Sequence, residues 1–256
     1  MLEWLLRGLR KGRVTTGYPA TPEPPPPGFH GPVAVTPLPL EGRSIAGLCP
    51  TAAIAVTADR RYAVDRGRCI QCGACVRADP ERFGFVEAYE TASRSREALV
   101  VDGLGGPDEL PAVRAALGDQ VAALRRSVHI RHVDAGSDGA EEWEVAALLN
   151  PYYDVQRLGL FFTPSPRHAD VLLVTGGITA PMRGPLERAH AVMPAPKAVV
   201  AVGTDACSGG LAEAATHGGV DQVLPVDVYV PGSPPAPIAI LHGLLLAIGV
   251  LREAAT

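Results

Sequence analysis

Three cysteines separated by two residues each constrain this chain more than any other feature of its sequence. The run is Cys69-Ile-Gln-Cys72-Gly-Ala-Cys75, and Asp79-Pro80 follows it. Bacterial iron–sulfur sites use the pattern C-x2-C-x2-C-x3-C-P, so the run holds three ligands and has Asp79 at the fourth position. Because ligation and folding are coupled in small metal-binding units, this segment is expected to fold around a metal–sulfur centre.

The missing fourth ligand is expected upstream, directly before a proline. In two-cluster ferredoxins, the fourth cysteine of one run ligates the cluster of the other run. Cys49-Pro50 fits this role, while the other upstream slots hold Pro39, Gly42 and Ile45, which cannot bind iron. The alternatives are a zinc site, which usually pairs two C-x2-C hooks, or a disulfide pair. The pattern favours one [4Fe–4S] cluster, with the ligands Cys49, Cys69, Cys72 and Cys75.

Composition disfavours several classes of function. The 256 residues suffice for one or two domains, and the net charge of −4 offers no basic surface for nucleic acid. Five cysteines, four of them assigned to a cluster, indicate an intracellular protein rather than a disulfide-stabilised one. The apolar run 238–251 is too short to span a bilayer, and we see no secretory signal. We therefore expect a cytoplasmic protein.

The N-terminal segment Met1–Arg13 is expected to form an amphipathic helix. Its leucines fall at helical spacing and form one apolar stripe, with basic residues at its flank and its end. Such a helix lies either on an anionic membrane surface or on the core of its own protein, because it is too short to be stable alone in water. The proline-rich run 21–28 follows and favours an extended spacer or strap.

Residues 33–103 are predicted to form a small α+β module of the ferredoxin-like type around the cysteines. Two short strands at 53–56 and 62–64 flank a turn and carry the chain from the first cysteine back to the other three. A helix over 107–128 is expected to connect this module to the second half of the chain.

The second half alternates between predicted strands and helices. Strands are expected at 128–133, 155–162, 171–175, 198–202 and 223–226, and helices at 142–149, 186–193 and 237–252. This alternation is typical of an α/β fold with a parallel sheet covered by helices. Sites in such sheets form beyond the carboxyl ends of the strands. The loops expected there are 134–142, 176–184, 203–210 and 230–235.

Five segments of the second half carry a resemblance, and they occur in order. They are 133–137 (VDAGS), 165–176 (SPRHADVLLVTG), 196–203 (PKAVVAVG), 208–210 (SGG) and 226–235 (VDVYVPGSPP). The series resembles the small, cluster-bearing subunit shared by respiratory complex I (its B, or 20-kDa, subunit) and the membrane-bound group 4 [NiFe] hydrogenases. The first half resembles the two-cluster ferredoxin-like subunit of the same complexes, so the chain looks like a fusion. The expected units are an arm and strap at 1–32, a ferredoxin-like domain at 33–103, a linker helix at 104–127 and a small-subunit-like domain at 128–256.

The resemblance implies a flavodoxin-like domain and a proximal [4Fe–4S] cluster held by four cysteines. The residues aligned with those cysteines are Asp138, Glu141, Asp205 and Ser233, which we call the degenerate cluster site. None of them is a thiolate, and Cys207 lies two residues beyond the third position, so we expect no cluster in this domain. Two alternatives stay open: the oxygen groups bind a hard cation such as magnesium, calcium or manganese, or they hydrogen-bond to loop amides and face water.

The resemblance also bears on other residues of the second half. Thr179 and Met182 match a loop motif that lines the quinone cavity of complex I, and the alternative is a structural role in the loop. Glu142 and Glu144 match family acids that face a large-subunit partner, or else they cap their helix and face solvent. His168 is expected to make a loop contact rather than to act as a base.

These features predict an iron–sulfur subunit of a membrane-associated oxidoreductase complex, peripheral on the cytoplasmic face of the cell membrane. The subunit is expected to transfer electrons or to be non-catalytic, with a large hydrogenase-like or complex I-like subunit and membrane subunits as partners. The alternative is a structural subunit of a related ion-translocating complex, in which the cluster staples the fold. A third hypothesis is a ferredoxin-like donor fused to a ligand-binding domain. The chain lacks a G-x-G-x-x-G fingerprint, so we expect no direct binding of NADH.

Overall fold

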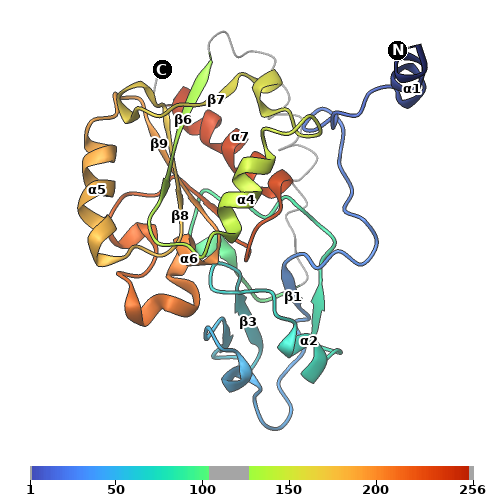
Figure 1. The fold of residues 1–256 in the computed structure, drawn as a ribbon. Helices are drawn as coiled ribbons and strands as arrows, with labels where there is room; N and C mark the ends of the chain where they lie inside the picture. The colour runs from blue at the N-terminus through green and yellow to red at the C-terminus, as the bar shows by residue number, and fades with distance from the viewer. Residues whose placement is uncertain (1, 104–126, 254–256) are drawn as a thin grey trace.

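A computed structural model describes residues 2–103 and 127–253, in two parts that pack against each other (Figure 1). We call residues 33–103 the cysteine module and residues 128–253 the sheet domain. An N-terminal arm leads into both parts and begins with helix α1 (Leu2–Lys11). The linker helix expected over 107–128 falls almost entirely on residues outside those described.

The sheet domain is built on five parallel strands. They are β6 (Val128–Asp134), β7 (Leu160–Phe162), β8 (Val171–Thr175), β9 (Ala198–Val202) and β10 (Val228–Val230). Their order across the sheet is β10-β9-β8-β6-β7, and every neighbouring pair is parallel. Numbered within the domain, this is the flavodoxin-type order 2-1-3-4-5, which changes direction between β6 and β8. The expected α/β class with a parallel sheet is confirmed.

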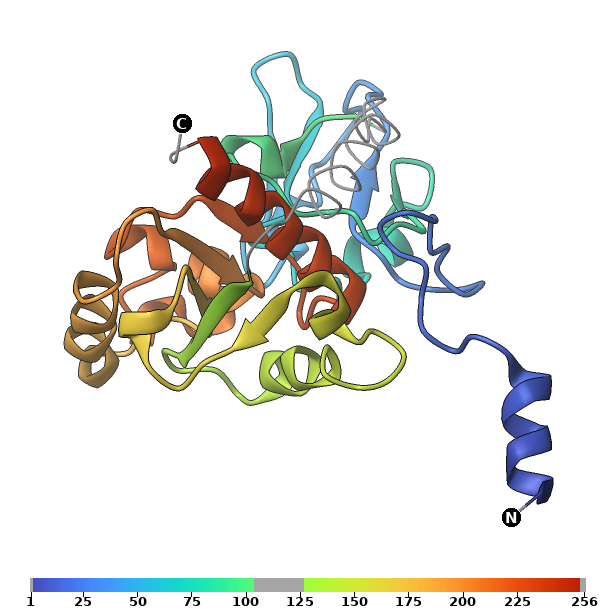
Figure 2. The ribbon, with the colours of Figure 1, turned by 90° about the horizontal axis from the view of Figure 1, so that it is seen from above.

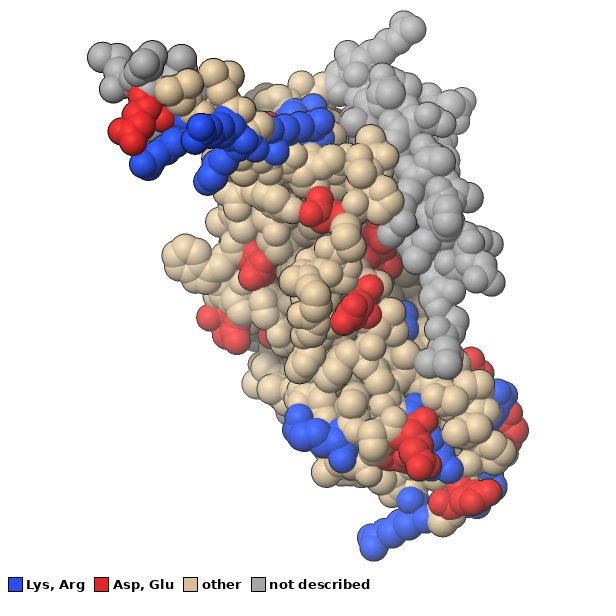
Figure 3. Space-filling model, turned by 90° about the vertical axis from the view of Figure 1, so that its right-hand side faces the viewer, with Lys and Arg blue, Asp and Glu red and all other residues tan. Residues whose placement is uncertain are grey.

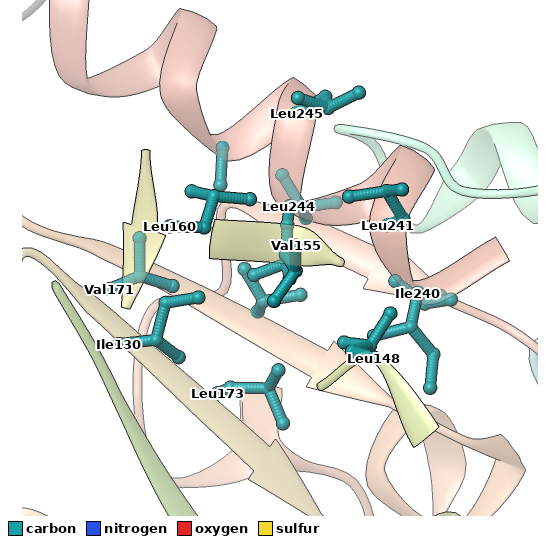
Figure 4. Close-up of a cluster of buried hydrophobic side chains, with 14 of the residues drawn as sticks. Ile130, Leu148, Val155, Leu160, Val171, Leu173, Ile240, Leu241, Leu244 and Leu245 are labelled. Carbon is teal, nitrogen blue, oxygen red and sulfur yellow. The ribbon is translucent and has the colours of Figure 1, made fainter. Parts of the chain in front are cut away.

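Helices cover both faces of this sheet. Helices α4 (Ala140–Ala147) and α7 (Pro237–Glu253) lie on one face, and α5 (Ala180–Ala191) and α6 (Thr204–Ser208) lie on the other. Every residue of β8 and β9 is buried, because both faces of these central strands are covered. Figure 4 shows one of the two resulting cores, in which Ile130 and Leu173 of the sheet lie beneath Leu241 and Leu244 of α7.

The cysteine module contains two small antiparallel sheets. One pairs β1 (Val33–Val35) with β4 (Phe83–Phe85), and the other has the order β2 (Ile54–Val56), β3 (Tyr62–Asp65), β5 (Val100–Val101). The short helices between them are η1 (Ala46–Leu48), α2 (Ala74–Ala78) and η2 (Glu97–Leu99). The predicted hairpin is confirmed, with Ile54 opposite Val64. The core of the module packs directly against Cys49, Cys69 and Cys75.

The arm is fastened to the sheet domain by the segment after α1. The amide of Thr16 donates to the carbonyl of Tyr152 at 2.8 Å, and Arg157 Nη2 donates to the carbonyl of Tyr18 at 2.6 Å. Tyr18 is 1% exposed and belongs to the core of the sheet domain. Helix α1 itself projects away from the body (Figure 2), and its Leu9 is 73% exposed.

Three expected elements of the sheet domain differ in the structure. The segment 155–162 begins as the 3-10 helix η3 (Val155–Leu158), because Asp154 and Gly159 on either side adopt left-handed backbone and only β7 is extended. The strand expected at 223–226 is wrong, since β10 lies two residues beyond it. The helix expected at 186–193 starts six residues earlier, at Ala180. The remaining short helices are η4 (Pro166–His168), η5 (Gly210–Ala215) and η6 (Val220–Gln222).

Candidate functional site

Four cysteines from three parts of the cysteine module line one pocket. Cys49 follows η1, Cys69 and Cys72 lie in the loop after β3, and Cys75 is in α2. The other walls are apolar and come from β1, β2 and β3. Cys75 is buried, Cys49 and Cys69 are half-buried, and Cys72 is exposed. The remote cysteine and the C-x2-C-x2-C run therefore do meet in space.

Backbone amides point at two of the sulfurs. Ala53 N–H donates to Cys49 Sγ at 3.2 Å, and Gln71 N–H donates to Cys69 Sγ at 3.4 Å. Ala52 and Gln71 adopt positive φ angles of 50° and 54°, which side-chain-bearing residues rarely take. Such strained backbone persists only where the surrounding structure holds it, and here it turns the amides towards the thiol groups.

The thiol groups need a cation if they are to ionise. Burial raises the pKa of Cys69 to about 12, and negative charge on the three neighbouring cysteines acts in the same direction. Burial also raises the pKa of Cys75. Metal binding replaces the thiol protons and compensates the charge, so this donor set fits a metal–sulfur centre.

The arrangement does not suit a single ion. Within the described residues, no group of three or more His, Cys, Asp or Glu side chains converges as the ligands of one metal ion do. In a [4Fe–4S] cluster each thiolate binds a different iron, so the sulfurs surround the group rather than one point. The four cysteines could hold a cluster of that kind, whereas a tetrahedral zinc site requires closer convergence.

Asp79, at the position of the absent fourth cysteine, has a structural role. It ends helix α2, and its Oδ2 accepts from Arg82 Nη1 at 3.2 Å. Ile45, in one of the upstream slots, donates its amide to the Tyr62 hydroxyl at 2.9 Å.

The degenerate cluster site lies at the carboxyl end of the sheet, where the strand order changes direction. Three of its four residues come together there: Asp138 before α4, Glu141 in the first turn of α4 and Asp205 in α6. Glu141 is 2% exposed, and burial together with the charges of Asp205 and Asp138 raises its pKa to about 7. Burial and the charge of Asp138 also raise the pKa of Asp205. Ser233 is exposed in the neighbouring loop.

The other residues singled out by sequence have mostly structural contacts. Thr179 precedes α5 and donates its hydroxyl to the carbonyl of Ala135 at 3.0 Å, while Met182 packs partly buried in the core. His168 is exposed in η4. Cys207 is 1% exposed and packs in the core beneath α5 and α6, where burial raises its pKa to about 12.

A hydrogen-bonded network around Glu142 was not foreseen from the sequence. Its Oε2 accepts from the Ser137 hydroxyl at 2.5 Å, and its Oε1 accepts from the Thr175 hydroxyl. His132 Nε2 lies 2.9 Å from the Thr175 hydroxyl oxygen. Glu144 lies on the same helix and lines a separate pocket between the two parts of the molecule.

The thiol pocket and the degenerate cluster site lie on either side of one interface. The Thr204 hydroxyl, in α6, lies 3.1 Å from the carbonyl oxygen of Cys69 and 3.1 Å from that of Gly232. Arg68, next to Cys69, forms an ion pair with Glu213. No sequence signal indicates these contacts, because they join residues more than 130 positions apart.

Comparison with known proteins places the sheet domain in a family. Residues 139–247 match the model of the NADH ubiquinone oxidoreductase 20 Kd subunit. The chain is 42% identical to formate hydrogenlyase subunit 7 of Escherichia coli K12 over 132 residues, 51% of this chain and 52% of that protein. It is 42% identical to the probable membrane-bound hydrogenase subunit mbhJ of Pyrococcus furiosus, over 51% of this chain and 79% of mbhJ.

A third relative comes from the respiratory branch. The chain is 46% identical to a subunit of the NADH-quinone oxidoreductase of Desulfovibrio desulfuricans over 103 residues, 40% of this chain and 56% of that protein. The match therefore spans about half of formate hydrogenlyase subunit 7 and of this respiratory relative. Among the described helices, none has the length and apolarity needed to cross a membrane. The sheet domain, its ordered loop motifs and these matches together show that the chain belongs to the NADH:ubiquinone oxidoreductase 20-kDa subunit family.

Proposed function

We propose that this chain is an iron–sulfur subunit of a membrane-associated complex related to NADH–quinone oxidoreductase and the group 4 hydrogenases. It carries one [4Fe–4S] cluster on Cys49, Cys69, Cys72 and Cys75, and no proximal cluster in the sheet domain. In this proposal the cysteine module is a ferredoxin-like unit fused to the 20-kDa-like domain. The partners are a large subunit and membrane subunits of the same complex.

The observation that carries the proposal is the common pocket of the four cysteines. Two amide groups donate to its sulfurs, and such bonds favour the thiolate and set the reduction potential of a cluster. The cluster would supply one-electron transfer. The protein would hold it through the four sulfurs and keep the apolar side away from water, while the exposed Cys72 edge is open to a donor.

The degenerate cluster site supports the absence of a second cluster. Its residues offer three carboxyl groups and a hydroxyl, and cubane clusters require thiolates. Cys207 does not replace them, because its sulfur faces the carbonyl of Ala201 at 3.9 Å within the core.

The decisive test is the iron content of protein purified without air. About four iron and four sulfide ions per chain, with the electron paramagnetic resonance signal of one reduced [4Fe–4S] cluster, are expected. About eight iron ions per chain would contradict the loss of the proximal cluster, and a protein free of iron would overturn the proposal.

A basic N-terminal helix supports association with the membrane surface. Figure 3 shows Lys and Arg side chains gathered over α1 and the segment that follows it. Leu6 and Leu9 of the same helix are 50% and 73% exposed. Apolar and basic side chains combined in this way favour an anionic membrane surface.

A structural role in an ion-translocating complex is the second candidate. It is favoured by the degenerate cluster site, since an electron arriving at Cys69 would meet carboxyl groups beyond α6 instead of a second cluster. A cluster that low-potential one-electron donors fail to reduce would support this structural role. Reduction by such donors, followed by reoxidation by a partner subunit, would support electron transfer.

A further inference from the structure

Glu141 is a buried carboxyl group with an unsatisfied oxygen. It lies in the first turn of α4 and is 2% exposed, and its Oε2 has no hydrogen-bond partner among the described residues. An unpaired carboxylate is costly to bury, and it avoids most of that cost by binding a proton. The carboxyl group therefore points to a ligand as small as a proton.

The surroundings of Glu141 are shaped for carboxyl groups. A Cβ atom at Gly203 would lie 2.5 Å from Glu141 Oε1, and one at Gly210 would overlap Asp205 Oδ1. Two glycines thus leave the space that the two acidic side chains fill. The charged groups that act on Glu141 are Asp205 of α6, Asp138 of the preceding loop and Glu142 of its own helix, and all three are acidic.

We propose that Asp138, Glu141 and Asp205, which we call the acidic triad, form a proton-binding site in which Glu141 carries the proton. Like charges held close together cannot all ionise, so one carboxyl of the triad keeps a proton where isolated carboxyls would lose theirs. The raised pKa of Glu141 agrees with this assignment. A metal ion is the weaker candidate, because no three acidic side chains among the described residues converge on one point.

The site deepens the proposed function in one respect, which rests on the presence of the cluster. Thr204 lies next to Asp205, and its hydroxyl contacts the carbonyl oxygen of Cys69 across the interface. When a one-electron donor reduces the cluster, one negative charge is added on the Cys69 side of α6. The ionised fraction of Glu141 then takes up a proton from water, and no other bond forms or breaks.

Infrared spectroscopy of the full chain tests the proton site directly. The wild type is expected to show a protonated-carboxyl band that disappears with a midpoint near pH 7, and Glu141→Gln should lack it. Asp205→Asn should keep the band and move its midpoint to lower pH, because one like charge is gone. Glu187→Gln, on the exposed face of α5, is the control and should leave the band unchanged.

Two results would overturn the proton site. One is a wild-type spectrum without a band that Glu141→Gln removes. The other is loss of the band on addition of manganese ions at micromolar concentration, which would assign the triad to a cation. Circular dichroism of each variant confirms that a missing band does not reflect unfolding.

A redox titration tests the coupling separately. The midpoint potential of the cluster should fall with rising pH around pH 7, by at most about 59 mV per pH unit, the value of a tenfold change for one electron. The slope should flatten in Glu141→Gln and persist in Glu187→Gln. Equal slopes in the wild type and Glu141→Gln would overturn the coupling. A protein free of iron would overturn both the coupling and the proposed function, while the infrared band would still decide the proton site.

Discussion

Individual residues at the interface between the two parts carry most of the chemistry of this chain. Cys69 offers its sulfur to the thiol pocket and its carbonyl oxygen to Thr204 of the sheet domain. Glu141 lies buried on the far side of α6 from that contact. The thiol pocket and the acidic triad are thus separated by one short helix.

The first prediction at this scale concerns the cluster ligands. Cys75→Ser is expected to lose most of the iron, because a hydroxyl is a poor ligand for an iron–sulfur cluster and Cys75 is the most buried of the four ligands. Iron and acid-labile sulfide per chain are the measurement. Cys207→Ala is the matched control, since it removes a buried thiol outside the pocket. Equal iron in both variants would contradict the ligand assignment.

Glu141 makes stability depend on pH. Its pKa in the folded protein, about 7, lies above the ordinary value of 4.5, so the folded state binds this proton more tightly than the unfolded chain. The resulting stabilisation is complete below the ordinary value and is lost as the pH rises through 7. The loss is at most about 3 kcal/mol, at about 1.4 kcal/mol per pKa unit.

Urea unfolding of Glu141→Gln at about pH 5 and pH 8 measures this effect. The variant should unfold with a similar free energy to the wild type at the lower pH and be more stable than the wild type at the higher pH. A wild type and variant that lose stability in parallel between the two values would show that Glu141 does not titrate in this range.

Short elements, rather than the long helices, set the positions of the functional groups. The cysteine spacing could be predicted to form a site because three of its ligands are local in sequence. The position of β10 could not, because Val223 and Leu224 are as apolar as a strand but pack after η6, and Pro225 lacks an amide hydrogen. The chain pairs with β9 only after Pro225, where Asp227 Oδ2 accepts from the amide of Val199 at 2.8 Å.

The same limit applies to the degenerate cluster site. The alignment of loop motifs predicted that Asp138, Glu141 and Asp205 lie near one another, because carboxyl ends of parallel strands share one edge. The depth of Glu141 and the exposure of Ser233 depend on packing between α4, α6 and their loops, and no local pattern encodes that packing.

Helix α1 provides the prediction at the scale of elements. Leu6→Glu combined with Leu9→Glu should abolish binding to vesicles that contain anionic lipids, because both leucines are exposed on the basic helix. Co-sedimentation with the vesicles is the measurement, and salt should weaken wild-type binding. Leu211→Glu, exposed in η5 of the sheet domain, is the control. Binding that survives the double substitution would assign membrane attachment to another surface.

The whole molecule joins a small module with little apolar core to a larger domain with two extensive cores. The cysteine module has one core, and its cysteines pack against it. The sheet domain has a core on each face of its sheet. A metal–sulfur centre therefore contributes a larger share of the stability of the module than of the domain.

Removal of iron tests this difference. After oxidative loss of the cluster, amide hydrogens of β1 to β4 should exchange faster, while those of β8 and β9 should keep their protection. Hydrogen exchange followed by mass spectrometry gives both values in one sample, so the sheet domain is an internal control. Loss of protection in β8 and β9 to the same degree would show that the two parts unfold as one unit.

The burial of Tyr18 has a mechanical consequence. Since this ring is locked into the core of the sheet domain, any force applied to α1 enters the molecule there and bypasses the cysteine module. A membrane that tilts or tugs on the arm would thus turn the larger domain first, and the thiol pocket would follow only as cargo.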